Sequence, residues 1–131
     1  LTYVGPLPLL FLPSNFVVYS MKAILIDTQN QRIVEVDIPK GNNQAIYDQL
    51  GEGTTLMEGA VRFKNNDIIM VDEEGLFNSK FGCFTFEGSH PFHGNGLVLG
   101  GTSQGGSADV KATVEQIRAK VRFGILVSKD I

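Results

Sequence analysis

Two histidines and a glutamate lie close together in the chain, at Glu87, His90 and His93. Imidazole nitrogens and carboxylates are ligands that zinc and similar ions accept. Pro91 favours a loop over a helix, so the spacing alone does not bring the three side chains onto one face. A zinc site would also need a further ligand, for which the sequence offers Asp72, Glu73 and Glu74. We therefore interpret the histidines as polar loop residues and predict neither a metal nor a cofactor.

A second candidate is Ser103, which lies between Gly101 and Gly105 in the Gly-x-Ser-x-Gly pattern of a nucleophile elbow. In the fold that uses this elbow, the catalytic histidine follows the serine in the chain. His90 and His93 both precede Ser103, and no histidine follows it. The sequence therefore predicts a strand-to-helix loop and no catalytic residue, and an enzyme is the least favoured class of function.

The same glycine-rich stretch, residues 100–107, precedes a predicted helix, where backbone N–H groups can bind an anion. It lacks the lysine of a P-loop, and Asp109 would place a negative charge beside the anion, so a plain mobile loop is favoured. As an alternative function, the loops 87–94 and 100–107 flank the predicted strand 96–100 and could together border a pocket for a small metabolite or nucleotide. The candidate ligand-binding residues are His90, His93, Glu87, Gly101, Ser103, Gly105 and Ser107.

The chain contains a single cysteine, Cys83. One thiol can form neither an intramolecular disulfide nor a cysteine-rich zinc site, so a reducing compartment, by default the cytoplasm, is the simplest assignment. Cys83 lies between Phe81 and Phe84 in an apolar stretch, which favours an inert buried thiol over a catalytic nucleophile.

The composition is that of one small globular domain. A length of 131 residues fits a single core, and 43% hydrophobic against 19% charged residues gives enough apolar surface to offset the ordering entropy. The net charge of −3 argues against nucleic acid as a partner, because phosphate binding needs clustered lysines and arginines.

Residues 1–20 form an apolar segment without a charge. A secretory signal has a basic region ahead of its apolar run, whereas Lys22 follows this one. The prolines at 6, 8 and 13 break the helix that a membrane span requires, so we expect no membrane contact. Because Met21 opens a new pattern, we expect residues 1–20 to be an extension upstream of the natural start, residues 21–124 to be a single α+β domain and residues 125–131 to be a tail.

Short β-branched and apolar runs separated by turn residues predict mostly strands. Residues 27–30 and 64–67 supply turns that join these runs into hairpins. Because no βαβ repeat recurs, we predict an α+β fold, a largely antiparallel sheet of hairpins with two helices packed on it. The strands are expected at residues 22–26, 32–38, 54–63, 68–71, 83–86 and 96–100.

Two segments have helical signals. Asn42 or Asn43 can cap a helix that runs to Leu50 and ends at Gly51. A second helix is expected to begin after Asp109 as its N-cap, with an apolar stripe at Val110, Val114, Ile117 and Val121.

Four segments, at residues 21–27, 46–51, 71–76 and 96–100, occur in an order and spacing that point to a family. Over residues 21–101 the chain resembles the small family catalogued as domain of unknown function thirty-eight forty-six, found in bacteria, phages and mobile elements. The resemblance implies a setting in a phage, plasmid or gene cassette, and no established activity, cofactor or catalytic residue.

These observations together favour a function without catalysis. We expect an accessory protein of a mobile genetic element that acts by protein–protein binding. Several short strands leave sheet edges exposed, and the apolar extension, if ordered, needs a surface to cover, so a homodimer is the simplest assembly. An unidentified protein partner is the other form that this binding could take.

Overall fold

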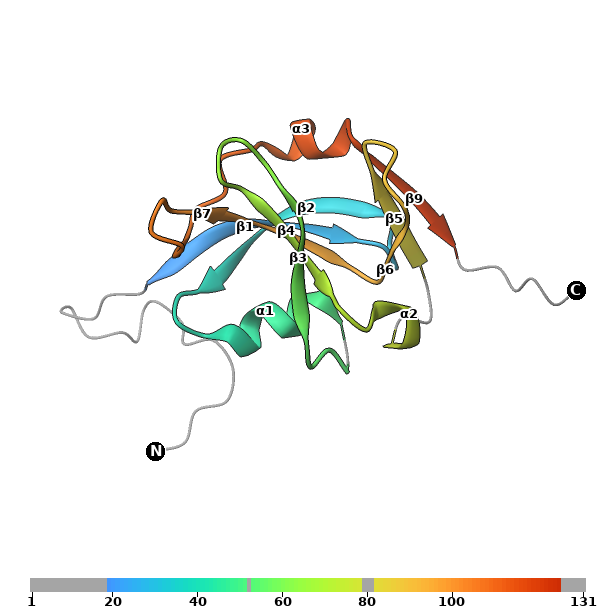
Figure 1. Ribbon diagram of the computed structural model, residues 1–131, viewed down its shortest axis with the longest axis horizontal. Helices are drawn as coiled ribbons and strands as arrows, with labels where there is room; N and C mark the ends of the chain where they lie inside the picture. Colours follow the sequence, from blue (N-terminus) through green and yellow to red (C-terminus); the bar gives the residue numbers. More distant parts are fainter. Residues whose placement is uncertain (1–18, 52, 79–81, 126–131) are drawn as a thin grey trace, which may run out of the picture.

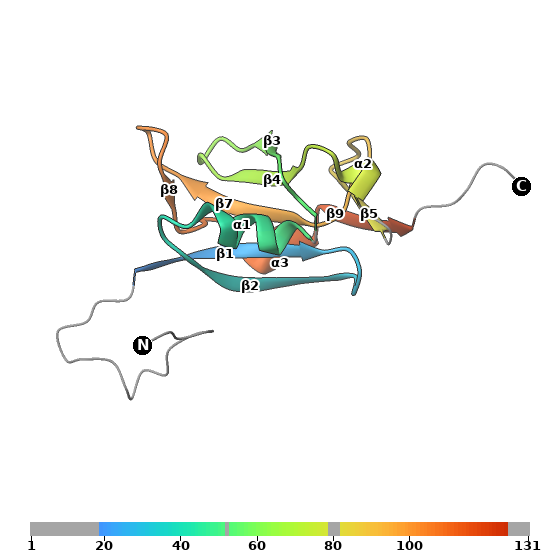
Figure 2. The same cartoon turned by 90° about the horizontal axis from the view of Figure 1, so that it is seen from below.

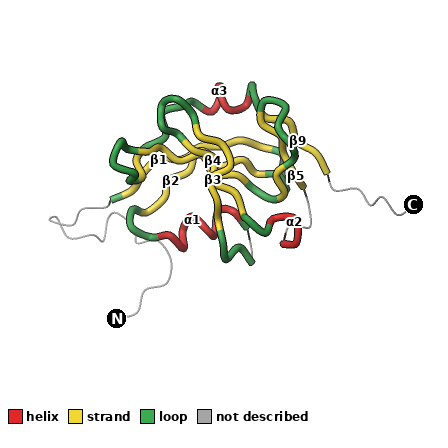
Figure 3. Tube along the Cα trace, viewed as in Figure 1, coloured by secondary structure: helices red, strands yellow, loops and turns green. Residues whose placement is uncertain are grey.

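The computed structural model of this chain describes residues 19–51, 53–78 and 82–125. These residues form nine strands and three short helices, arranged as two antiparallel sheets with helices at their surfaces (Figure 1). Figure 3 shows that strands make up more of the trace than the short helices do. The predicted α+β fold with a largely antiparallel sheet is confirmed. The predicted extension, apart from residues 19 and 20, lies outside the described residues, as do residues 126–131.

The larger sheet joins two hairpins through a strand that comes much later in the chain. The hairpins β1–β2 and β3–β4 are the ones that the sequence predicts, and β7 lies between β1 and β4, antiparallel to both. A short strand, β8, pairs with the end of β7. In the order β2-β1-β7-β4-β3, with β8 added, the strands are Arg32–Pro39, Ser20–Asp27, Gly96–Gly101, Ile68–Asp72, Met57–Arg62 and Ser107–Ala108.

The smaller sheet has β5 (Gly82–Phe86) between β6 (Phe92–His93) and β9 (Val121–Ile125). It packs against one face of the larger sheet through Phe84 and Phe86, which share a core with Ile24 and Ile26 of β1. Gly96 of β7 makes room for this contact, since a Cβ there would lie 2.7 Å from the ring of Phe84.

The opposite face of the larger sheet is covered by helix α1 (Asn43–Leu50). Ile46 and Leu50 of this helix form a second core with Leu25 of β1 and Leu97 of β7. Because both faces of β1 and β7 are buried, these strands are apolar at nearly every position instead of alternating. Asn42 is the N-cap, accepting a hydrogen bond from Ala45 N at 3.3 Å, so the predicted start of this helix is confirmed.

The second predicted helix is wrong in its limits. Helix α3 spans only Val114–Arg118, and its N-cap is Thr113, which forms a capping box with Gln116. Asp109 instead accepts a hydrogen bond from Lys22 N at 2.8 Å, and Val121 begins β9. The residues of the apolar stripe are all at least partly buried, as the pattern predicts. Its two ends lie outside the helix, however, with Val110 in the segment before α3 and Val121 in β9.

A buried carboxylate fixes the position of the segment before α3. Asp67 is fully buried and accepts hydrogen bonds from Lys111 N at 3.1 Å and from Ala112 N at 2.9 Å. Asn65 Nδ2 donates to the same carboxylate at 3.2 Å. In a helix capped by Asp109, the N–H groups of Lys111 and Ala112 would lie in the first turn beside that cap, whereas here they bind Asp67 and join the β3–β4 turn to the segment before α3.

One further helix, α2 (Gly75–Asn78), follows β4. Gly75 packs so closely on β6 that a Cβ there would overlap the carbonyl of His93. None of the helices in the described part of the chain is long and apolar enough to cross a membrane.

Candidate functional site

The structure separates the three residues of the His-containing loop. Glu87, at the end of β5, forms an ion pair with Lys120, with Oε1 and Nζ 3.0 Å apart. The ring of His90 packs on Phe92, with centroids 4.7 Å apart. Among the described residues, no group of three or more His, Cys, Asp or Glu side chains is placed to hold a metal ion.

His93 lies beside Cys83, its partner across β5 and β6. The Nδ1 atom of His93 is buried and has no hydrogen-bond partner among the described residues. Cys83 is half-buried, and a Cβ at Gly124 would lie 3.1 Å from its sulfur. The thiol is therefore less buried than we expected.

The glycine-rich loop is the turn of a hairpin between β7 and β8, where the sequence predicts a link from a strand to a helix. Its backbone N–H groups are occupied inside the turn, because Gly106 N donates to Thr102 Oγ1 at 2.9 Å and Gly105 N donates to Thr102 O at 3.1 Å. Thr102 N in turn donates to Gly106 O at 2.9 Å. A loop whose donors are used in this way offers little to an anion.

The two predicted loops do not meet. The residues of the first, at 87–94, belong to the smaller sheet, while Gly101, Ser103, Gly105 and Ser107 lie at the far end of β7. Figure 2 shows β8 and its loop at one end of the molecule, and β5 with α2 at the other.

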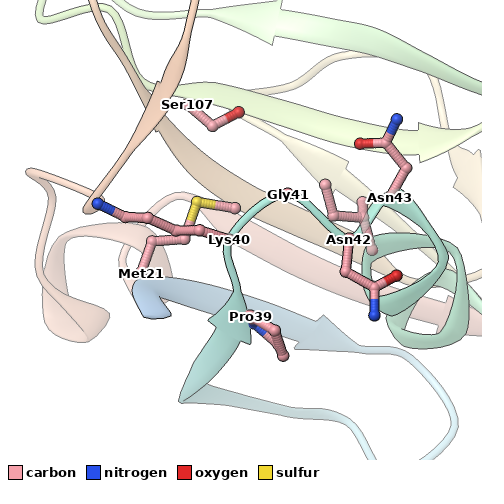
Figure 4. A pocket seen from close by; sticks show the side chains of 8 residues that line it. Met21, Pro39, Lys40, Gly41, Asn42, Asn43 and Ser107 are labelled. Carbon is pink, nitrogen blue, oxygen red and sulfur yellow. The ribbon is translucent and has the colours of Figure 1, made fainter. Parts of the chain in front are cut away.

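Ser107 does line a hollow of about 260 Å³ where β2 leads into α1 (Figure 4). Lys40 and Asn43, which sequence reasoning did not select, contribute its other polar side chains, together with Asn42. These groups do not converge: Asn42 caps the helix and points away from Ser107, and Lys40 extends away from Asn43 (Figure 4). In the sequence, the run Lys40-Gly-Asn-Asn43 is the feature that could have pointed to this hollow. By itself it indicates only the end of a strand and the cap of a helix.

The two outer strands of the larger sheet are the other candidate sites, since an edge strand has unpaired N–H and C=O groups. Lys40 N donates to Tyr19 O at 3.2 Å, so the alternation of the ladder directs the backbone groups of Ile33, Glu35, Asp37 and Pro39 to the free edge of β2. Helix α3 packs beside this strand, and Arg118 Nη2 lies 3.4 Å from the carbonyl oxygen of Ile33.

The edge of β3 is different. Leu56 O accepts from Glu73 N at 3.0 Å and Phe63 N donates to Asp67 O at 2.8 Å, which leaves the backbone groups of Met57, Gly59 and Arg62 directed outward. A bulge at Ala60 interrupts the register. In the described part of the chain β4 is the only strand beside β3, and neither Glu58 nor Arg62 has an ion pair.

Apolar side chains are exposed at one end of this edge. Leu56, which precedes β3, is 50% exposed, and Leu76, in α2, is 62% exposed. Both lie at the end of the β3–β4 hairpin where Leu56 bonds to Glu73. Exposed apolar groups beside unpaired backbone groups are typical of a protein-binding surface.

Comparison with known proteins gives no further guide, since no family model, curated protein or solved structure matches this chain. The resemblance drawn from the sequence stays a prediction.

Proposed function

We propose that this chain is a non-catalytic protein-binding domain that forms a homodimer through the free edge of β3. The observation that carries the proposal is the contrast between the two outer strands of one sheet. The edge of β2 is blocked by its own charges, by Pro39 and by Arg118, whereas β3 has outward backbone groups and only the bulge at Ala60.

The backbone of β3 suits pairing with a second copy. Glu58 and Arg62 lie on opposite faces of the sheet, because the bulge places Glu58 beside Val71 and Arg62 beside Ile68, which belong to different cores. An antiparallel pairing about a two-fold axis therefore rests on hydrogen bonds from the outward backbone groups of β3. A contact of this length is small, so we expect a dissociation constant on the order of 10–100 µM.

The setting that we propose is an accessory protein of a mobile genetic element in the cytoplasm. Its support is the resemblance of residues 21–101 and the single cysteine. An edge strand is also a surface to which another protein can add a strand, so a heterologous partner would use the same face.

Removal of an outward N–H group tests the homodimer. Met57→Pro should weaken dimerisation by about tenfold or more, because it removes a donor from the free edge of β3 and leaves the hydrogen bonds to β4 in place. Light scattering and sedimentation across the micromolar range measure the loss.

Asp37→Pro removes an outward N–H group from the free edge of β2 in the same way, and it should leave the dimer unchanged. A chain beginning at Met21 should dimerise equally well, which separates the edge of β3 from a contact made by residues 1–20. A monomer at high micromolar concentration, or equal effects of the two proline variants, would refute the proposed dimer.

A further inference from the structure

A second hollow, unrelated to the edge strands, opens between α3 and the turn that joins β3 to β4. These two segments lie side by side at the same side of the molecule (Figure 1), where Asp67 binds the segment before α3. The hollow has a volume of about 380 Å³. Four apolar residues line it: Phe63, Ala112, Ile117 and Ala119.

The hollow exists because small side chains stand where large ones would close the surface. Ile117 is 1% exposed and belongs to the core, and Phe63 is fixed edge-on against Phe86 with centroids 5.2 Å apart. Ala112 and Ala119 beside them are too short to cover these two side chains. The walls are therefore rigid and already packed, as they are in a pre-formed binding site.

The polar groups at the rim are mainly hydrogen-bond donors. Lys120 lines the hollow, and its ammonium group lies 3.0 Å from Glu87 Oε1 and 6.0 Å from the centre of the Phe86 ring. Gln116 contributes an amide whose Oε1 is engaged by Thr113 N at 2.9 Å, leaving its NH₂ group as the available end. Asn65 also lines the hollow, but its Oδ1 and Nδ2 are both bonded to Asp67. An occupant therefore needs an acceptor group, and next to a lysine an anionic one is favoured.

We infer that this hollow binds a small monocarboxylate with an aromatic or branched aliphatic body. The body lies on Phe63 and Ile117, and the carboxylate accepts hydrogen bonds from Lys120 and Gln116. An apolar lining with a few polar groups at one side, and a volume of this size, are typical of small-molecule sites.

The ion pair at the rim takes part in this binding. Glu87 Oε1 lies 3.0 Å from Lys120 Nζ, and both side chains are about half exposed, so the pair can open without burying a charge. A bound carboxylate competes with Glu87 for the same ammonium group. Removing the charge of Glu87 should therefore strengthen binding, while removing that of Lys120 should weaken it.

The test measures binding of benzoate and isovalerate to the full chain by NMR titration. Lys120→Gln should weaken benzoate binding by about tenfold or more, the loss expected for a charge-assisted hydrogen bond. Glu87→Gln should tighten it severalfold. Lys40→Gln, which removes a lysine outside this hollow, should change nothing.

A filling variant tests the location. Ala119 is exposed, so Ala119→Leu can enter the hollow without disturbing the core, and it should abolish binding while the circular dichroism spectrum and melting temperature stay unchanged. The inference is overturned if benzoate does not bind, if benzyl alcohol binds as tightly as benzoate, or if the Lys120 and Glu87 variants shift affinity in the same direction. None of these outcomes bears on the dimer, because the variants lie away from the edge of β3.

Discussion

The two outer strands of the larger sheet expose similar lengths of backbone but differ in how their free edges are protected. Glu35 and Asp37 follow one another along the free edge of β2, and Pro39 at its end has no N–H group. A two-fold pairing centred there would place acid against acid. On β3 the charged residues are Glu58 and Arg62, which have opposite signs and lie on opposite faces of the sheet.

The difference also extends to the surroundings. On β2, the carbonyl oxygen of Ile33 accepts from Arg118 of the same chain, and Glu35 Oε1 lies 3.5 Å from Lys22 Nζ. Groups along this edge therefore already have partners within the chain. The charges of β3 have no such internal partners among the described residues. Protection of an edge strand is therefore a property of each strand, and β3, whose only such feature among the described residues is the bulge at Ala60, is the less protected of the two.

The largest effect that we predict concerns the attachment of the β3–β4 turn to the segment before α3. Asp67→Ala should lower the free energy of unfolding by about 3 kcal/mol, because it leaves the N–H groups of Lys111 and Ala112 buried without their acceptor. Urea unfolding followed by circular dichroism measures the loss. Asp37→Ala on the exposed edge should change stability by less than about 0.5 kcal/mol. Equal losses for the two aspartates would contradict the anchoring role of Asp67.

The next prediction moves the dimer contact from one edge to the other. In the Met57→Pro background, which should be monomeric, the added pair Asp37→Arg/Pro39→Thr should restore dimerisation to within about tenfold, since position 37 then attracts Glu35 of a second copy and position 39 regains an N–H group. Sedimentation measures the association. Pro39→Thr alone in that background should stay monomeric, and a dimer there would show that the acids of β2 offer no protection.

A smaller effect concerns acid and the turn before β2. Burial raises the pKa of Asp27, but hydrogen bonds from Asn30 and Arg32 outweigh it, so the pKa lies below its ordinary value of 3.8. This carboxylate therefore adds stability that is fully present above pH 3.8 and is lost as the pH falls through the lower pKa of the folded state.

Melting temperatures measured across that pH range should fall less steeply for Asp27→Asn than for the original chain. Hydrogen exchange should show the acid-sensitive part in the β1–β2 hairpin and not in β3–β4, where Asp27 makes no bond. An unchanged pH slope in the variant would refute this assignment.

The smallest predicted effect is that of salt on the dimer. Raising the ionic strength from about 0.05 M to about 0.5 M should change the dissociation constant by less than about twofold, because the pairing is made by backbone hydrogen bonds and Glu58 and Arg62 lie on opposite faces of the sheet. Sedimentation at the two ionic strengths measures the difference. A change of about tenfold would show that charges between the copies govern the contact.

Much of the local structure could be predicted from the sequence. Both hairpins, the turn at Asn65 and the helix capped by Asn42 have signals within a few residues of one another. The prediction failed at Asp109 and Val121. An apolar residue every three or four positions is expected from one continuous helix, but it also arises when a non-helical segment, a short helix and a strand follow one another and are buried on the same side. The capping box at Thr113 and Gln116 was the signal that could have corrected the helix start.

The candidate sites were less predictable than the fold. The sequence groups Glu87, His90 and His93 because they are neighbours along the chain. In the structure, Glu87 forms an ion pair with Lys120, and the ring of His90 packs on Phe92. The residues that line the apolar hollow come from the β3–β4 turn and from α3, about fifty positions apart. No pattern of spacing along the chain predicts that these residues come together, because contacts between distant segments depend on how the sheets pack.

The amino-acid sequence by itself determined which short segments extend and where they turn, since those outcomes depend on side chains within one hairpin or one helical turn. It also determined that β1 and β7 are buried on both faces, because they are apolar at nearly every position. Only the tertiary structure decided that β7 joins the two hairpins, that Asp67 binds the segment before α3, and that β3 is the less protected edge. Those outcomes depend on long-range hydrogen bonds and on the order of strands, which local propensity does not encode.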